Sequence, residues 1–154
     1  MMAKAAARQV GALPWRKKAG GIEILLVTSR ETKRWVIPKG WPMAHLIASN
    51  AAKREAYEEA GIDGRVQRKA IGRYTYDKRA RDGSSQPCIV TVYAFRVLRE
   101  HRTWPEKAER KRCWFKFEDA AELVNEADLR ALIRSFESGL GHGRTAKARA
   151  RAAT

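Results

Sequence analysis

The sequence predicts a protein of the α/β or α+β class, with a mixed β-sheet sandwiched between α-helices. Short apolar or β-branched stretches alternate along the chain with two helical patterns. The 154 residues suffice for one domain with a substantial core and are too few for two comfortable ones. A hydrophobic fraction of 44%, with five Trp, is typical of a globular protein rather than a disordered chain.

The first part of the chain is predicted to form three strands and a loop. The central strand is the clearest, because its sequence IEILLVT is apolar and β-branched. Pro38 ends the third strand, and Pro42 disfavours helix at the residue before it. In chain order we expect a disordered N-terminus at 1–7, strands over 8–16, 22–28 and 34–37, and a loop over 38–42.

A helix is predicted to begin between His45 and Asn50 and to run to Ala60. Ser49 and Asn50 are both candidate N-caps. Gly61 has the residue type that commonly follows the last helical residue. One face of the helix carries a stripe of small residues that would let it pack closely against a sheet, namely Ala52, Ala56 and Ala60.

The second half of the chain is predicted to hold three strands, two polar loops and one helix. The helix is expected from the spacing of its apolar residues, and Gly139 and Gly141 are expected to end it. The domain as a whole is expected over 8–140, followed by a basic, disordered tail at 141–154. The expected elements are strands over 66–76, 89–98 and 113–117, loops over 77–87 and 99–111, and a helix over 118–138.

The chain is strongly basic, with 32 Lys and Arg against 17 Asp and Glu, a net charge of +15 and a pI near 10.4. Such a protein is expected to meet anions, whether nucleic acid, a membrane surface or a polyphosphate. Cys88 and Cys113 are too few for a disulfide scaffold and lack metal-ligand spacing. No apolar run is long enough to span a membrane, and no signal peptide is apparent, so we expect a cytoplasmic protein.

The stretch KREAYEEAG, residues 53–61, places three carboxylates where a helix disfavours them. Glu55, Glu58 and Glu59 share one helix face, so they repel one another. They also lie near the C-terminus, where the helix dipole is negative and prefers cations. A solvated helix surface is one interpretation. A divalent cation would remove both objections, because Mg²⁺ and Mn²⁺ favour carboxylate oxygens, water and phosphate.

The spacing around these residues resembles the Nudix box of the Nudix hydrolases. Arg54 follows Gly40 by fourteen positions and opens REAYEEAGI, which matches the Arg-Glu, Glu-Glu and Gly-apolar positions of the box. The resemblance implies the Nudix fold and cleavage of pyrophosphate bonds with Mg²⁺ or Mn²⁺. Leu46 departs from the pattern, where a Glu is expected, so Arg54 must find another partner or pair mainly with the glutamates.

The resemblance also implies roles for the residues that match the box. Glu58 or Glu59 is expected to serve as the general base and Arg54 to belong to the catalytic group, while loop carboxylates are alternative bases. The expected metal ligands are Glu55, Glu58 and Glu59, helped by a backbone carbonyl at Lys39 or Gly40. The loop alternatives for the base are Asp77, Asp82, Glu106 and Glu109.

Beyond the box, the chain resembles the diphosphoinositol polyphosphate and diadenosine polyphosphate hydrolase branch. The similarity lies in LLVTSRETKRWVIPKG and ERKRCWFKFEDAAELV. It implies a small-molecule polyphosphate substrate held by Ser29, Arg30, Lys39, Trp41, Arg110, Lys111 and Arg112. Trp41 is either a stacking surface for a base or a loop anchor. A looser similarity adds Lys78, Arg79 and Arg81 of the predicted 77–87 loop.

Two kinds of alternative remain at the level of sequence. Within the same class, the substrate could be an RNA 5′ end or a nucleotide sugar, and the high positive charge fits RNA as well. In a different class, the chain could be an inactive Nudix scaffold that binds polyphosphate or nucleic acid. Either a monomer or a homodimer is compatible with the sequence.

Overall fold

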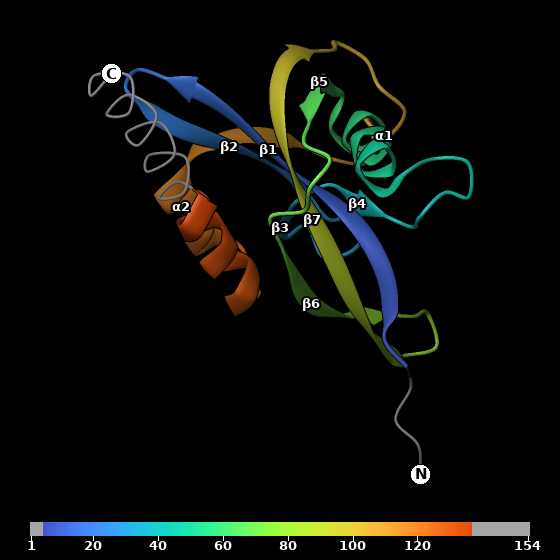
Figure 1. The fold of residues 1–154 in the computed structure, drawn as a ribbon. Coiled ribbons are helices and arrows are strands. Elements are labelled where there is room, and N and C mark those ends of the chain that lie inside the picture. Colours follow the sequence, from blue (N-terminus) through green and yellow to red (C-terminus); the bar gives the residue numbers. More distant parts are fainter. Residues whose placement is uncertain (1–4, 137–154) are drawn as a thin grey trace, which may run out of the picture.

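Eight strands form one mixed sheet within residues 5–136, the part of the chain that this computed structural model describes (Figure 1). Helices lie on both faces of the sheet, as the sequence predicts. The elements are β1 (Ala7–Lys18), β2 (Gly21–Thr28), β3 (Trp35–Val36), β4 (Lys39–Gly40), α1 (Ala48–Ala60), β5 (Ile62–Val66), β6 (Gly72–Arg79), β7 (Ser85–Glu100), β8 (Arg112–Lys116) and α2 (Phe117–Leu123). Residues 127–136 form a further helical segment.

The centre of the sheet is a parallel pair, β1 and β7, in the order β3-β2-β1-β7-β5. All other pairings are antiparallel. Three strands lie off this path: β4 pairs with β1, β6 with β7, and β8 with β2. The short strand β4 places Gly40 opposite Val10 and Lys39 opposite Gly11. The loop of the predicted box is therefore attached to the middle of the sheet.

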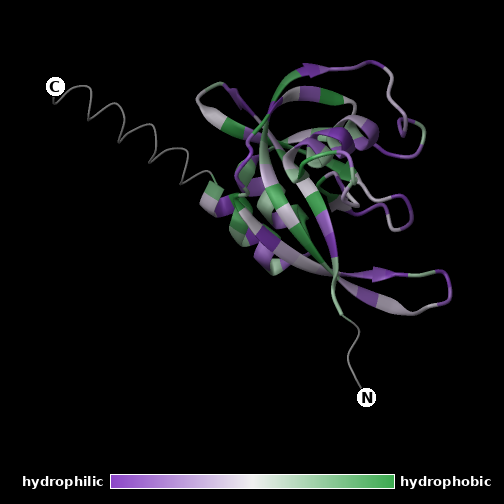
Figure 2. Cartoon of the chain, turned by 45° about the vertical axis from the view of Figure 1, so that its right-hand side comes forward, coloured by the Kyte–Doolittle hydropathy of each residue, from purple (hydrophilic) through white to green (hydrophobic). Residues whose placement is uncertain are grey.

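Alternating side chains of the central strands form two separate cores. Val10 and Ala12 of β1 face the side that α1 covers, together with Leu25 of β2. Leu13 and Ile24 face the opposite side, where α2 and the 127–136 segment pack. Figure 2 shows apolar residues in the strands and hydrophilic residues concentrated in the connecting loops. This alternation is the period of two expected of a strand, here with both faces buried.

Helix α1 packs against the sheet through the predicted small-residue stripe. Ala52, Ala56 and Ala60 are completely buried. The helix ends at Gly61, whose φ of 66° is left-handed, as the sequence predicts. The predicted N-cap is wrong: the cap residue is Ile47, which makes no side-chain cap hydrogen bond. Ser49 lies inside the helix and is buried, so it is not available to cap the helix from outside.

Several other predictions of secondary structure are also wrong. The loop predicted over 38–42 contains the short strand β4. Ala7 is the first residue of β1 rather than part of a disordered N-terminus. The single strand predicted over 66–76 is two elements, β5 and β6. The predicted 77–87 loop is mostly a hairpin, because β6 and β7 pair as far as Arg79 and Ser85. The continuous polar sequence DKRARDGSSQP concealed this hairpin, because both of its strand ends are exposed and show no apolar alternation.

The helix predicted over 118–138 is interrupted. Helix α2 ends at Leu123, and Val124 is extended, with ψ of 146°. Arg130 holds the break, because its guanidinium donates to the carbonyls of Ala121 at 3.1 Å and Val124 at 3.2 Å. The predicted end of the helix, with Gly139 and Gly141, and the 141–154 tail lie outside the described residues. None of the described helices is long and apolar enough to cross a membrane.

Candidate active site

The last turns of α1 meet the loop that contains β4. The Glu55 carboxylate lies directly against Gly40, where a Cβ atom would overlap it. The backbone N–H of Lys39 donates to Oε1 of Glu59 at 3.3 Å. The structure thus brings Glu55 next to Gly40 and Glu59 next to Lys39, whereas the shared metal site remains a prediction.

Glu59 is the most buried of the three glutamates and is paired with Arg110. Its Oε2 lies 3.6 Å from Nη2 of Arg110. The same guanidinium donates from Nε to Glu106 at 2.8 Å and from Nη1 to the carbonyl of Thr28 at 3.1 Å. Arg110 is itself only 9% exposed, so it is held between two carboxylates and a strand end. Glu106, one of the predicted loop carboxylates, therefore lies beside Glu59.

Glu58 points to the exposed side of α1, where it pairs with Arg54 at 3.2 Å. This is the alternative partner that the sequence required for Arg54, given Leu46 at the sixth position after Gly40. The Leu46 side chain instead packs against the core on the α1 side of the sheet. Position 46 therefore makes an apolar contact instead of supplying a charge, and the Arg54 side chain remains 60% exposed.

Glu55 is half-buried, and it forms no hydrogen bond or ion pair with any residue in 5–136. Burial, together with the neighbouring charges of Glu59, Glu58 and Glu106, raises the pKa of Glu55 to about 7, although Arg110 acts in the opposite direction. Burial also raises the pKa of Glu59 to about 7, although Arg110 and Lys39 act in the opposite direction. Four carboxylates thus lie close enough to influence one another, and Glu55 is the one without a direct ion pair or hydrogen bond within residues 5–136.

The donor chemistry of this site fits a hard divalent cation. As the side chains stand, no three Asp, Glu, His or Cys residues among those described converge in a metal-binding geometry. Glu58 and Glu59 are turned toward Arg54 and Arg110 instead, as expected for repelling carboxylates that have basic neighbours. The partnerless Glu55 carboxylate against Gly40 is nevertheless an oxygen ligand of the kind that Mg²⁺ and Mn²⁺ prefer.

The segment that holds Ser29 and Arg30 lies next to the segment that holds Arg110, Lys111 and Arg112. The backbone of Thr28 bonds to the backbone of Lys111 at 3.0 Å, and the Lys111 N–H donates to the Thr28 hydroxyl at 2.9 Å. Arg30, in the turn that follows, is 58% exposed and lies 3.9 Å from Glu109. Ser29 is used within that turn, because its hydroxyl accepts from the N–H of Arg34 at 3.1 Å.

Lys39 and Arg112 are less available for contact with substrate than the sequence suggested. Burial lowers the pKa of the Lys39 ammonium, while Glu59 acts to raise it, and Nζ lies 4.9 Å from the centroid of the Tyr76 ring. The Arg112 guanidinium donates to the carbonyls of Ala60, Gly61 and His101. Its engagement with the backbone gives no support to a direct contact with substrate.

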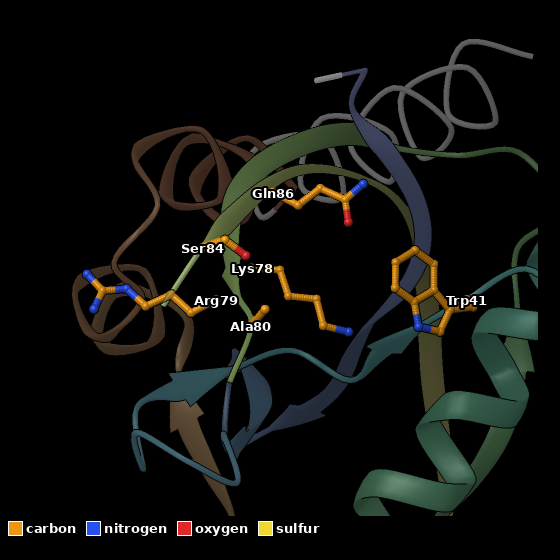
Figure 3. A pocket seen from close by; sticks show the side chains of 6 residues that line it. All are labelled: Trp41, Lys78, Arg79, Ala80, Ser84 and Gln86. Carbon is orange, nitrogen blue, oxygen red and sulfur yellow. The ribbon is translucent and has the colours of Figure 1, made fainter. Parts of the chain in front are cut away.

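A hollow of about 210 Å³ separates Trp41 from the β6–β7 hairpin (Figure 3). Trp41 is 46% exposed, and the Lys78 ammonium reaches to 4.7 Å from its ring centroid. In Figure 3 Lys78 extends toward the Trp41 ring, whereas the Arg79 side chain points away from it. The hollow is lined by Trp41, Lys78, Arg79, Ala80, Ser84 and Gln86. Trp41 therefore lines the same hollow as Lys78 and Arg79, whose segment resembles the family only loosely in sequence.

Sequence reasoning missed Trp104. Its indole N–H donates to the backbone carbonyl of Glu59 at 3.1 Å. A Trp within a polar, basic loop could have indicated this contact, because so large an apolar side chain is not favoured at a fully exposed position.

The fold is that of a Nudix protein, and the chain belongs to the Nudix family. The NUDIX domain matches residues 6–136, nearly all of the described part of the chain. This match confirms the resemblance first seen in the box spacing and the predicted fold class.

Named relatives agree with the branch that the sequence resembles. Human diphosphoinositol polyphosphate phosphohydrolase 3-beta is 34% identical over 106 residues, covering 66% of this chain and 60% of that protein. Nudix hydrolase 21, chloroplastic, of Arabidopsis thaliana is 33% identical over 136 residues, covering 82% of this chain and 64% of its own length. The matched region thus spans less than two thirds of either relative.

Among solved structures, the crystal structure of a C. elegans Ap4A hydrolase binary complex aligns with a TM-score of 0.67 at 25% identity. The alignment covers 89% of this chain and 99% of that one. A NUDIX hydrolase from Nitrosomonas europaea has the same TM-score of 0.67 at 15% identity, which speaks for the fold alone.

Proposed function

We propose that this protein hydrolyses the pyrophosphate bonds of polyphosphorylated small molecules, using Mg²⁺ or Mn²⁺. The observation that carries the proposal is the half-buried, partnerless Glu55 carboxylate among Glu58, Glu59 and Glu106, within a strongly basic protein. Acids that bind a cation and basic residues that bind phosphate are the two requirements of phosphoryl-transfer chemistry. The similarity to named Nudix hydrolases and to an Ap4A hydrolase supports the same activity.

In this proposal Glu55, Glu58 and Glu59 hold the cation, with a backbone carbonyl at Lys39 or Gly40. When bound, the cation neutralises charge on the phosphate oxygens and acidifies a water molecule. Arg110 orients Glu59 and Glu106 by contacting both carboxylates. The Lys39 N–H orients Glu59 from the other side.

The general base is proposed to be Glu59 or Glu58, which would accept the proton of the attacking water. A carboxylate with a pKa of about 7, as Glu59 has in the metal-free protein, suits proton transfer near neutral pH. A bound cation favours the ionised carboxylate and lowers that pKa. Glu58 is the alternative because its side chain lies at the surface of α1, where it pairs with Arg54.

Substrate phosphates are proposed to contact the exposed basic residues beside the carboxylates, chiefly Arg30 and Lys111. Trp41 and Lys78 would contact a more distant part of the substrate across the hollow shown in Figure 3. Arg110 was predicted to bind phosphate, but its burial between Glu59 and Glu106 suits a positioning role better. The proposed substrates are dinucleoside polyphosphates or diphosphoinositol polyphosphates.

A substrate panel in Mg²⁺ or Mn²⁺ tests this proposal. It compares diadenosine polyphosphates, diphosphoinositol polyphosphates, triphosphorylated RNA and ADP-ribose. Turnover should favour the long, highly charged chains over ADP-ribose. Arg30→Ala should reduce the catalytic efficiency on a pentaphosphate-linked substrate by about tenfold or more, since one charge-assisted contact contributes about 1.5–3 kcal/mol, and should affect ADP-ribose less. A clear preference for ADP-ribose would contradict the assigned substrate class.

RNA 5′ ends are a second candidate, favoured by the net charge of +15. Hydrolysis of triphosphorylated RNA that falls steeply with salt would support it. Binding of RNA or polyphosphate without turnover would indicate an inactive scaffold instead. A cytoplasmic location and a monomeric or dimeric state remain predictions; the names of several plant relatives place those proteins in chloroplasts or mitochondria.

A further inference from the structure

The C-terminal turn of α1 is enclosed by residues 101–112, which lie far from it in sequence. The last carbonyls of a helix have no partners within the helix. Here the carbonyl of Glu58 accepts from the N–H of Glu106 at 3.0 Å, and that of Glu59 accepts from the Trp104 indole at 3.1 Å. The carbonyl of Ala60 accepts from Nη1 of Arg112 at 2.9 Å.

The enclosure continues past the helix end. The carbonyl of Gly61 accepts from the N–H of His101 at 2.7 Å and from Nη1 of Arg112 at 3.2 Å. A Cβ at position 61 would come within 2.8 Å of the same Nη1 and would collide with the Trp104 ring. Four successive carbonyls, those of residues 58–61, therefore accept hydrogen bonds from donors outside α1. We call the residues responsible the C-terminal collar: His101, Trp104, Glu106 and Arg112.

Arg112 connects the parts of the collar. Its Nη2 donates to the carbonyl of His101 at 2.7 Å, and its guanidinium carbon lies 4.0 Å from the Trp104 ring centroid. The last turn of α1 contains no basic residue of its own. Arg112, carried by β8, thus supplies the cation that the negative end of the helix dipole favours. This arrangement explains how Glu58 and Glu59 are tolerated in the last turn.

We propose that Arg112 is a positioning residue that, with Trp104, fixes the backbone of Glu58 and Glu59 for cation binding, and that it does not contact substrate. This inference rests on the proposed function for its catalytic consequence. Both glutamates have their carbonyls held by the collar, so loosening the collar loosens the backbone that carries their carboxylates. Residues that orient metal ligands typically contribute about 10- to 100-fold to metal affinity or activity.

The first test uses metal-free protein and needs no activity. Hydrogen exchange should accelerate in Arg112→Ala at the amides of Gly61, His101 and Glu106, whose acceptors all lie in the last turn of α1 or at Gly61. Arg112→Lys should show the same direction of change, because an ammonium cannot reproduce the planar, multiply bonded guanidinium. Arg102→Ala is the matched control: it removes the same charge from an exposed side chain in the neighbouring 101–111 segment.

The second test separates positioning from substrate contact. In Arg112→Ala the Mn²⁺ affinity, measured by calorimetry without substrate, should fall about 10- to 100-fold, and kcat should fall while KM changes little. Trp104→Phe keeps the ring and removes one donor, so it should weaken Mn²⁺ binding less but in the same direction. It serves as the test if Arg112→Ala does not fold.

Unchanged Mn²⁺ affinity and unchanged exchange in both Arg112→Lys and Trp104→Phe would overturn the inference. So would a raised KM with parental Mn²⁺ affinity, which is the signature of a phosphate contact. If the parent protein turns over no substrate of the panel, the proposed function fails, whereas the exchange and Mn²⁺ data still decide whether the collar positions α1.

Discussion

Glu55→Gln should stabilise the metal-free protein while removing its response to Mn²⁺. Glu55 is half-buried beside three other carboxylates and forms no ion pair with any residue in 5–136, and the charge of Arg110 offsets their repulsion only in part. Ionising it in the folded protein is therefore unfavourable. Glutamine has nearly the same shape and carries no charge, so the substitution removes the repulsion without creating a cavity.

The magnitude follows from the pKa. A rise from 4.5 to about 7 corresponds to about 3.4 kcal/mol as an upper bound, at about 1.36 kcal/mol per pKa unit. Because Glu55 is only half-buried, solvent screens the repulsion, and we expect about 1–2 kcal/mol. Below pH 4.5 Glu55 is protonated in both states and contributes nothing. Between pH 4.5 and about 7 the folded state retains a proton that the unfolded state has lost, so the parent loses stability as pH rises.

The assay is urea unfolding followed by tryptophan fluorescence, with EDTA and then with Mn²⁺. In EDTA the advantage of Glu55→Gln over the parent should be near zero at pH 4.5 and complete above pH 7. With Mn²⁺ at about 100 times its Kd, the parent should gain about 2.7 kcal/mol and the variant much less. Glu31→Gln, at an exposed position outside the site, is the control and should follow the parent throughout.

Two outcomes would refute this reasoning. If Glu55→Gln is less stable than the parent in EDTA above pH 7, the Glu55 charge is compensated and the site is not a repulsive cluster. If the variant retains the full Mn²⁺ response, Glu55 is not a ligand of the cation.

Three further predictions concern the loop, the helix contact and the tail. Gly40→Ala should weaken Mn²⁺ binding measured by calorimetry, since the added Cβ would displace the Glu55 carboxylate; Gly21→Ala, whose Cβ would meet only the Lys18 carbonyl at 4.0 Å, should not. Ala56→Leu should lower the free energy of unfolding by about 1–3 kcal/mol in urea titrations, because α1 has no room against the sheet. Truncation after Leu140 should leave turnover of a small substrate unchanged at about 0.15 M salt, where long-range attraction is screened; loss of turnover would show that the tail contributes to the chemistry.

The sequence by itself determined the features that depend on local spacing. The apolar, β-branched run of β2, the alanine stripe of α1 and the glycine after α1 each depend on a few neighbouring residues, and each is found in the structure. The box spacing likewise indicated that Gly40 and the glutamates would share a site. Leu46 even indicated that Arg54 needs a new partner, which is Glu58.

Only the tertiary structure decided which distant residues complete the site. The parallel pairing of β1 with β7 joins segments separated by about eighty residues, and no local pattern encodes it. Arg110 and Arg112 looked alike in sequence, yet one inserts between Glu59 and Glu106 and the other caps α1. Long cationic side chains have several anionic and carbonyl partners within reach, and the choice among them is set by the packing of β8 and the 101–111 segment against α1. That packing places Arg110 and Arg112 at the end of α1, whose own last turn contains no basic residue.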